Sequence, residues 1–534
     1  MTELSLEDVE VLRAVLSIHE PLGPSFADKL GDHPSALLFA AQNQVYSLST
    51  HPGFLIGRRG AGKTAFLQHL RQTSPHSHQL VFDPVETFPK IITTIEKFFL
   101  SPPPTVELIE ELWDVLIWTC VFIEMLKGGH GDDARTQTLE TYAAHIGTDT
   151  KQAPDETIFN TLERLRECME AGVPVRTPNE LRRALSFDGV SYKDTRAAAR
   201  ELLEISGMPK SNPVLVLMDT LETYNVSQDE AVHAISGLIR FVGQRANSNQ
   251  GLDIRFCLPV ELYNTFQEAS QNPSKDFSSA TSLQWHAGDL LTICAHRLTL
   301  YFKLVDCPRH RELAETNVEH RAGAVALFQR ILPSGMTNLQ GDVEPTLAYI
   351  LRHTQLLPRH TVHIFNRILS AAIDRTTGCL GVVDPKHVVD GIKNSEQTVV
   401  HGIMQAYHHR YPLLRSYCAD VLPQLPRRFS DGVLHEAFNR HGKGVKKFLK
   451  TGEDELDYPL FKKMLIEVGA IGKLQAETDL YLEAEYAYTV PADLVVSLDD
   501  DLCLHPIFSS VYKGASKGSD VKPVYPYGSD PDRD

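Results

Sequence analysis

The sequence has no run of about 18 apolar residues, the length that a membrane-spanning helix requires. Its start, MTELSLEDVEVL, is acidic and lacks the basic residues and apolar core of a secretory leader. The composition, 42% hydrophobic and 22% charged, is typical of a folded globular protein rather than of a disordered or membrane chain. We therefore expect a soluble, cytoplasmic protein.

Metal-binding and disulfide patterns are also missing. The eight cysteines contain no C-x-x-C pair, and the 23 histidines contain no H-E-x-x-H motif. Cysteines scattered in this way suit buried thiols in a reducing compartment, so we expect neither a zinc site nor a disulfide framework. The doublet His408 and His409 lacks metal-ligand spacing, and we interpret the histidines as surface or core residues.

The charge balance argues against one class of protein, in which the whole molecule binds nucleic acid. The sequence carries 52 Lys and Arg residues against 68 Asp and Glu residues, a formal net charge of -16. This excess repels phosphate, so it disfavours nucleic-acid binding by the whole molecule and leaves only a local basic patch for that role. At 534 residues the chain exceeds what one hydrophobic core usually supports, and we expect about two to four structural units.

The segment FLIGRRGAGKTAFLQHL, residues 54–70, contains a phosphate-binding pattern. Residues 54–56 have the apolar character of a buried strand end, and the apolar residues after Thr64 recur at helical spacing. The turn between them spells G-x-x-x-x-G-K-T. Its glycines permit a tight turn with inward-pointing N–H groups at a helix N-terminus, which is an anion-binding arrangement. The expected nucleotide-binding residues are Gly57, Arg58, Arg59, Gly60, Ala61, Gly62, Lys63, Thr64 and Ala65.

Two side chains of this turn suit ATP and magnesium. Lys63 is placed to bind the β- and γ-phosphates, and the Thr64 hydroxyl is placed to ligate the Mg²⁺ ion that bridges them. Arg58 and Arg59 leave two alternatives open: they contact phosphate or a neighbouring subunit, or they are exposed and solvated. No N-K-x-D motif for reading guanine is present, so ATP is the expected nucleotide, and a guanine nucleotide stays open as the alternative.

A magnesium site at a phosphate loop needs an acidic residue from another strand. In NPVLVLMDTLETY, residues 212–224, an apolar run ends at Asp219, as expected of a central parallel strand. Asp219 is the predicted magnesium ligand. Thr220 follows it in place of the acid found in many similar proteins, so Glu222 is the candidate that orients or deprotonates the attacking water. The alternative is that Glu222 is an exposed glutamate without a role.

Further strands fit the same sheet. Residues 78–84, HQLVFDP, suit a second strand, and residues 252–263, LDIRFCLPVELY, suit the strand whose end usually carries a polar γ-phosphate sensor. Pro259 stands where that sensor is expected, and Glu261 is the nearest polar substitute. Residues 282–298, SLQWHAGDLLTICAHRL, suit a short strand followed by a helix.

This order of phosphate loop, acidic strand, sensor strand and strand–helix resembles the AAA+ and STAND class of ATPases, especially the origin-recognition and archaeal-ATPase branch. The similarity covers residues 50–300. It implies an α/β fold with a parallel-sheet P-loop NTPase core, a helical lid, and assembly through the ATP sites. In that class, a lid arginine contacts the γ-phosphate, and an arginine of one protomer reaches the γ-phosphate of the next.

Candidate arginines for these roles follow from the resemblance. HTQLLPRHTVHIFNRIL, residues 353–369, is similar to the lid segment, with Arg359 as the expected sensor and Arg352 and Arg367 as competing choices. Each of the three has the simpler alternative of capping a helix. Arg297, on the helix after the last strand, is the candidate that reaches a neighbouring phosphate. The expected catalytic residues are thus Glu222, Arg297 and Arg359.

The apolar patterns divide the chain into segments. We expect an N-terminal helical segment (1–50), an ATPase core (51–300) with a helical insertion (86–205), a helical lid (301–395), a connector (396–425), a winged-helix-like domain (426–512) and a disordered tail (513–534). The insertion contains TVELIEELWDVLIWTCVFIEMLKGG, whose aromatic and aliphatic residues are too many for one exposed face. That helix is expected to be buried, and it either packs on the core or carries a partner surface.

The predicted winged-helix module contains two stretches of sequence with opposite charge. Its order of helix, turn, helix and paired strands resembles modules that often bind DNA. A basic run suits contact with phosphates: Arg427, Arg428, Arg440, Lys443, Lys446, Lys447 and Lys450. The predicted wing, residues 476–501, carries eight carboxylates and no Lys or Arg, which repels a duplex backbone. Contact with protein, or packing within the chain, is therefore favoured over contact with nucleic acid.

Together these patterns predict an ATP-binding molecular switch with slow hydrolysis through Glu222. ATP–Mg²⁺ would close core and lid and change how the insertion and the C-terminal module meet other proteins, either further copies of the chain or a separate effector. Two other accounts stay open: a nucleic-acid-stimulated motor or loader, and a structural ATP-binding scaffold without turnover, which Thr220 suggests. Prokaryotic members of the resembled class often act in stress or anti-phage systems. No membrane partner is expected.

Overall fold

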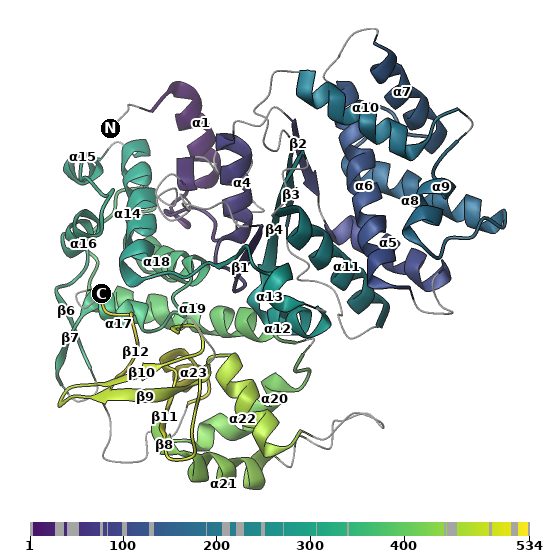
Figure 1. Ribbon diagram of the computed structural model, residues 1–534. Helices are drawn as coiled ribbons and strands as arrows, with labels where there is room; N and C mark the ends of the chain where they lie inside the picture. The colour runs from purple at the N-terminus through teal and green to yellow at the C-terminus, as the bar shows by residue number, and fades with distance from the viewer. Residues whose placement is uncertain are drawn as a thin grey trace. The chain divides into compact units, whose positions relative to one another are not determined.

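The computed structural model describes most of the chain as two compact units (Figure 1). The described residues are 4–26, 37–39, 53–74, 78–82, 84–98, 104–127, 133–187, 189–205, 214–219, 229–246, 251–270, 272–305, 307–338, 341–408, 410–442, 445, 456–490, 494–513 and 522–531. The first unit, which we call the sheet unit, comprises Leu48–Arg58 and Lys63–Leu283. The second unit comprises Met1–Ser47, Arg59–Gly62 and Gln284–Asp534.

A five-stranded parallel sheet lies in the sheet unit, and it confirms the predicted α/β class. Its strands are β1 (Phe54–Gly57), β2 (His78–Phe82), β3 (Val214–Met218), β4 (Leu252–Pro259) and β5 (Ala280–Ser282), in the spatial order β2-β3-β4-β1-β5. All neighbouring pairs run parallel. β1 and β3 are buried along their whole length, as expected of strands covered on both faces. Because the strands are parallel, the carboxyl ends of β1 and β3 lie at one edge of the sheet, with β4 between them.

Helices cover both faces of this sheet. α4 (Lys63–Thr73) contacts β1, β3 and β4, and α11 (Asp229–Ala246) contacts β4 from the other side (Figure 1). α12 (Val260–Ala269) and α13 (Pro273–Asp276) follow β4. α11 also packs against α6 (Val106–Lys127), where Trp113 Nε1 donates to Ala234 O at 2.9 Å. The two helices approach closely at Gly237, because a Cβ there would lie 2.9 Å from the backbone carbonyl carbon of Ile109.

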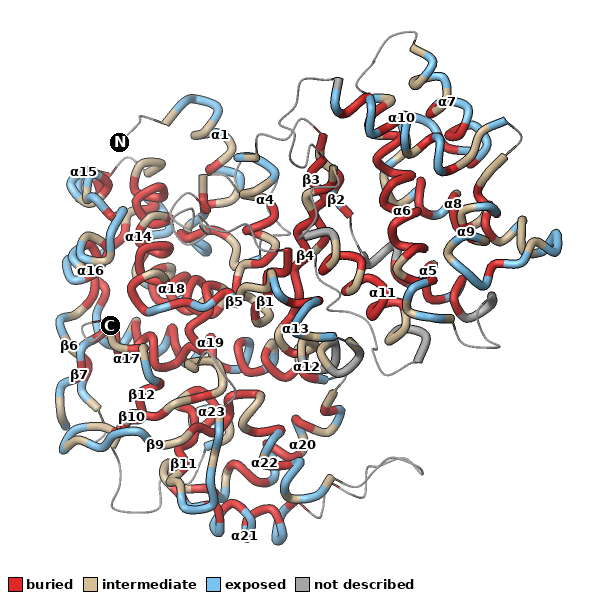
Figure 2. The backbone as a smooth tube through the Cα atoms, viewed as in Figure 1, coloured by how far each residue is buried: buried red, intermediate tan, exposed pale blue. Residues whose placement is uncertain are grey.

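Helices fill the predicted insertion. They are α5 (Pro84–Phe98), α6, α7 (Ala134–Ile146), α8 (Pro154–Glu170), α9 (Pro178–Ala184) and α10 (Tyr192–Ile205). Every residue of α6 from 111 to 123 is buried, as its apolar composition predicts (Figure 2). The acids in this stretch are paired: Arg182 binds Glu111 at 2.6 Å, and Arg196 binds Asp114 at 2.5 Å. Pairing of this kind is what permits carboxylates inside an apolar helix.

The described part of the second unit up to residue 424 consists mainly of helices. Its elements up to residue 424 are α1 (Leu6–Val15), α14 (Ala287–Leu304), α15 (Pro308–Ala314), α16 (Arg321–Gln329), β6 (Gly335–Thr337), β7 (Val343–Pro345), α17 (Thr346–Leu351), α18 (Pro358–Ala372), α19 (Pro385–Ala406), α20 (Leu414–Val421) and the 3-10 turn η3 (Leu422–Gln424). The predicted connector at 396–425 is therefore wrong for its described residues. Val399, Val400 and Ile403 are buried because they recur at helical spacing and continue the apolar face of α19. α14 also groups with this unit, whereas the prediction placed residues 284–300 in the core.

Residues 428–531 form the part of the second unit that we call the C-terminal module. Its elements are β8 (Arg428–Ser430), α21 (Asp431–His441), α22 (Tyr458–Glu467), β9 (Ile471–Glu477), β10 (Leu482–Glu485), β11 (Asp501–Leu504), α23 (Pro506–Val511) and β12 (Val524–Pro526). The strands form one sheet in the order β12-β10-β9-β11-β8. Helices precede paired strands as predicted, although 506–511 is a helix rather than a strand, started by Pro506. The winged-helix class itself stays a prediction.

The predicted disordered tail is wrong for residues 522–531. β12 pairs in parallel with β10, and Leu482 N donates to Pro523 O at 2.9 Å. Val524 and Tyr525 are buried in this pairing. A three-residue strand in a polar context has almost no local signature, because its order comes from the neighbouring strand and from the apolar surface that it covers.

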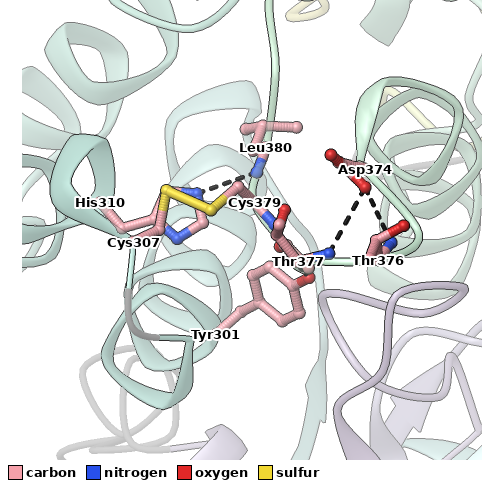
Figure 3. The surroundings of a disulfide bond; sticks show 9 residues. Tyr301, Cys307, His310, Asp374, Thr376, Thr377, Cys379 and Leu380 are labelled. Atoms are coloured by element: carbon pink, nitrogen blue, oxygen red, sulfur yellow. Dashed lines mark hydrogen bonds between the residues drawn. A yellow bond between two sulfur atoms is a disulfide. The ribbon is translucent and has the colours of Figure 1, made fainter.

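A disulfide joins Cys307 to Cys379, which corrects the expectation that all eight cysteines are free thiols (Figure 3). The two residues are 72 positions apart, so no local spacing could reveal the pair. The bond connects the start of α15 to the turn between α18 and α19. Beside it, the Leu380 N–H donates to His310 Nε2 at 2.9 Å, and Tyr301 Oη donates to Gly378 O at 2.7 Å. The start of α15 and the end of α14 are thus joined to the turn between α18 and α19 by a covalent bond and by buried hydrogen bonds.

Candidate functional site

The G-x-x-x-x-G-K-T segment forms the turn between β1 and α4. β1 ends at Gly57, and α4 begins at Lys63. Gly60 and Gly62 have φ angles of 90° and 95°, a left-handed region that side chains rarely adopt. These two positions therefore require glycine, and they give the tight turn that a phosphate-binding loop needs. Its middle residues, 59–62, group with the second unit by their contacts.

The Lys63 side chain is held against the loop. It is only 4% exposed, and its Nζ donates to the carbonyls of Gly57 at 3.1 Å and Arg58 at 3.2 Å. An ammonium has three N–H donors, and here two of them contact the backbone that surrounds the expected phosphate position. The buried cation beside the N-terminus of α4 makes this loop electropositive, which suits a polyphosphate.

The structure brings together the two residues expected to hold magnesium. Thr64 Oγ1 donates to Asp219 Oδ2 at 2.8 Å, although the residues are 155 positions apart. Asp219 directly follows β3, and Thr64 is the second residue of α4. A hydroxyl and a carboxylate in contact provide the oxygen ligands that Mg²⁺ prefers, so these residues fit the ion. Among the described residues no three His, Cys, Asp or Glu side chains group as a metal site.

The candidate for the water-activating residue lies outside the described residues. Both Thr220 and Glu222 belong to that part of the chain, so the role assigned to Glu222 stays a prediction. The substitute at the end of β4, Glu261, lies in the first turn of α12 and is 7% exposed. Pro259 ends β4 opposite Gly57 of β1.

Of the three arginines of the predicted lid segment, Arg359 is the one for which a contact with the loop is seen. Its backbone N–H donates to Gly60 O at 3.4 Å, and a Cβ on Gly60 would lie 2.9 Å from the Cβ of Arg359. The guanidinium lies 4.4 Å from the centre of the Phe26 ring. Of the competing choices, Arg352 pairs with Glu344 at 3.4 Å, and Arg367 is exposed on α18. The position of Arg359 favours it over the other two.

Arg297 lies in a different environment from the one expected for a residue that reaches another protomer. It is 4% exposed, and its Nη1 donates to the carbonyls of Leu22 and Pro24, both at 3.3 Å. Its guanidinium also lies 5.3 Å from the centre of the Phe39 ring. In this arrangement Arg297 stabilises the N-terminal segment. A contact with a neighbouring phosphate stays a prediction that would require that segment to move.

Trp285 is a loop contact that sequence reasoning missed. Its Nε1 donates to Ala61 O at 2.8 Å, and the side chain is almost completely buried. The sequence signal that could have identified it was its place three residues after the end of β5, whose carboxyl end lies at the same edge as that of β1. Trp285 also lines a cleft of about 600 Å³ in the second unit. Leu356, Tyr488 and Tyr527 line the same cleft, which therefore lies between lid residues and the C-terminal module.

The described members of the basic run are paired within the C-terminal module. Arg428 binds Asp501 at 2.6 Å and Glu477 at 2.7 Å, and Arg440 binds Glu436. Arg427 donates to Lys522 O at 3.4 Å. The four lysines of the run lie outside the described residues. Because carboxylates of the predicted wing neutralise Arg428, the described arginines of the run offer less positive charge to a nucleic acid than the sequence suggests.

Comparison with protein-family models gives no match, and comparison with curated proteins gives none either. Among solved structures, the chain is similar to the ORC2 protein of Aeropyrum pernix, solved as ADPNP-ADP complexes, with 13% identity and a TM-score of 0.34 over 90% of this chain and 91% of that chain. A likeness this weak carries no inference about activity. Within the described residues, no helix is long and apolar enough to cross a bilayer.

Proposed function

We propose that this chain is an ATP-binding molecular switch that hydrolyses ATP slowly and controls the assembly of a protein complex or a separate effector protein. The observation that carries the proposal is the contact of Thr64 with Asp219 at 2.8 Å, beside the buried Lys63 ammonium. A lysine, a hydroxyl and a carboxylate at one glycine turn are the groups that a nucleoside triphosphate with magnesium requires.

Each residue has a defined task in this proposal. Lys63 and the N–H groups of the loop bind the β- and γ-phosphates, and Thr64 and Asp219 hold the ion. Magnesium, when bound, would neutralise charge on the phosphates. Arg359 is the residue whose position would differ between the ATP-bound state and the empty state, because its backbone and Cβ pack against Gly60 of the loop. A γ-phosphate in the loop would therefore bias the position of this lid residue.

The rate of hydrolysis depends on Glu222, because Thr220 offers no carboxylate at the usual place. We expect slow turnover, which suits a switch that must stay in its ATP state long enough to engage a partner. The pairing of Arg428 supports a protein partner over a nucleic acid. Assembly into a homo-oligomer and a role in an anti-phage or stress system, which the resemblance implies, stay predictions.

Binding of a fluorescent ATP analogue tests the proposal. The wild-type chain should bind it, and Lys63→Ala should weaken binding by at least about tenfold, because the loss of one charge-assisted contact of about 1.5–3 kcal/mol corresponds to roughly that factor. Arg71→Ala, on α4 but away from the turn, is the matched control for the loss of a positive charge and should bind like the wild type. Equal affinities for wild type and Lys63→Ala would refute the proposal.

Magnesium dependence gives a second test. In the wild type, Mg²⁺ should strengthen ATP binding relative to EDTA. Asp219→Asn keeps the shape of the side chain and removes its charge, so it should reduce magnesium affinity by about 10–100-fold while metal-free binding changes little. A full magnesium effect in Asp219→Asn would mean that the ion, if it binds, lies elsewhere. Hydrolysis is then followed as phosphate release with and without DNA; stimulation by DNA would favour the motor account, and Glu222→Gln tests the assigned base.

A further inference from the structure

The turn that precedes Arg359 is attached to the C-terminal module through Gln355. The Gln355 side chain is 1% exposed, and its Nε2 donates to the carbonyls of Val468 at 3.0 Å and Gly469 at 3.4 Å. These carbonyls lie directly after the last residue of α22, where a helix leaves backbone acceptors without partners inside the helix. Gln355 therefore caps the end of a helix that belongs to another part of the second unit.

The end of α22 is built closely around this side chain. Gly469 has a φ of 71°, and its N–H donates to Ile466 O at 2.9 Å, while Ala470 N donates to Leu465 O at 2.9 Å. This is the left-handed glycine ending of a helix. A Cβ on Gly469 would lie 2.9 Å from Gln355 Nε2. The amide thus fills the space that glycine leaves, and a displacement of the α22 end must displace Gln355.

The two residues before Thr354, Arg352 and His353, also connect this turn to the C-terminal module. Arg352 pairs with Glu344 and lies 5.4 Å from the centre of the Tyr525 ring of β12. His353 Nδ1 is 3.1 Å from Glu396 Oε1, and Glu396 accepts from Ser510 of α23 at 2.5 Å. Residues 352–355 therefore hold β12, α23 and the end of α22 at once.

Between Gln355 and Arg359 the backbone is strained. Leu356 has a φ of 48°, although left-handed backbone is unfavourable for a branched side chain. Its N–H donates to Thr354 Oγ1 at 3.1 Å, which helps to hold this conformation. α18 starts at Pro358, so the link from the capping amide to the loop contact is only four residues long and contains a rigid helix start. Strain of this kind is typical of elements that change state.

We propose that Gln355 is a positioning residue, which couples the end of α22 to Arg359 and thereby to the phosphate loop. A protein partner that moves α22 would release the strained turn, shift Arg359 relative to Gly60, and change how tightly the loop binds nucleotide. By linkage, nucleotide in the loop changes the affinity for that partner by the same factor. The nucleotide part of this inference rests on the proposed function, whereas the mechanical coupling does not.

Two variants isolate the amide. Gln355→Met keeps the length of the side chain and removes both N–H donors. Gln397→Met makes the same chemical change at an exposed position of α19 and serves as the control. In full-length protein, Gln355→Met should weaken binding of the fluorescent ATP analogue by about fivefold or more, the lower end of coupling between sites, and the control should bind like the wild type.

Hydrogen exchange tests the coupling without nucleotide. Gln355→Met should speed amide exchange in residues 57–64, which are distant in sequence from the change. In the reverse direction, Gly60→Ala should push on Arg359 and speed exchange in residues 466–471. The Gly60→Ala experiment leaves Gln355 unchanged, so it tests the coupling between the loop and the end of α22 even if Gln355→Met does not fold.

The outcomes separate the two proposals. A wild-type chain that binds no nucleotide overturns the proposed function, and faster exchange at both remote segments would still support the coupling. Faster exchange confined to the C-terminal module in Gln355→Met, with the loop and the nucleotide affinity unchanged, would show that Gln355 has a structural role alone and would overturn the inference. No effect of Gly60→Ala on residues 466–471 would overturn it as well.

Discussion

The environment of the Arg297 side chain distinguishes a structural from a catalytic arginine. Its guanidinium donates to two carbonyls of the N-terminal segment while being buried. We expect Arg297→Ala to lower the free energy of unfolding by about 1–3 kcal/mol, because two buried acceptors lose a charged donor. Urea unfolding measures this loss. A variant with wild-type stability and a reduced rate of ATP hydrolysis would instead support the predicted contact with a neighbouring phosphate.

His310 is a buried acceptor whose charge depends on pH. Burial lowers its pKa below the ordinary value of 6.5, and its Nε2 accepts from the Leu380 N–H. Below about pH 6.5 the unfolded chain therefore binds a proton that the folded chain does not bind, so stability falls as the pH falls. His310→Gln keeps an acceptor at this position and cannot be protonated.

We expect the melting temperature of His310→Gln to fall less between pH 7.5 and pH 5.5 than that of the wild type. Burial also lowers the pKa values of His296 and His353, so part of the slope should persist in the variant. Differential scanning fluorimetry at several pH values makes the comparison. Identical slopes for the two proteins would mean that His310 does not contribute to the acid sensitivity.

At the scale of elements, the crossing of α6 and α11 requires a glycine. A Cβ on Gly237 would lie 2.9 Å from the carbonyl carbon of Ile109, so Gly237→Ala should force the helices apart and destabilise the protein by about 1–3 kcal/mol. Gly402 of α19 is the matched control, since nothing lies within 4 Å of its added Cβ. Gly402→Ala should stabilise by about 0.5–1 kcal/mol, because alanine favours a helix. Urea unfolding of both variants should give shifts of opposite sign.

The sequence predicts an element well when the residues that determine it lie close together in the chain, and poorly when they lie far apart. The phosphate turn and the strand that precedes Asp219 follow from residues a few positions apart, and the contact of Thr64 with Asp219 follows from parallel strands that end at one edge. By sequence pattern alone, Arg359, Arg352 and Arg367 are equally good candidates for the sensor arginine. Packing against Gly60 is what distinguishes Arg359 from the other two. β12 and the partner of Cys307 depend on chain segments far away in the sequence, so no window of the sequence contains their cause.

For the whole molecule, two compact units predict unfolding that is not two-state. Calorimetry should resolve two transitions. The Cys307–Cys379 disulfide closes a loop in the second unit and none in the sheet unit. Its reduction should therefore lower the melting temperature of the second unit alone, by an amount equivalent to about 2–4 kcal/mol. Cys379→Ser should give the same result without reductant. A single transition that both treatments shift as a whole would show that the units unfold together.

The bond from Trp285 to the Ala61 carbonyl has a spectroscopic consequence. The chain has three tryptophans, and the other two, Trp113 and Trp118, lie in α6. An indole whose N–H partner belongs to the glycine turn changes its emission when that turn rearranges. The protein thus contains an intrinsic optical probe of the turn, and a stopped-flow trace of its fluorescence can time the arrival of a ligand without any attached dye.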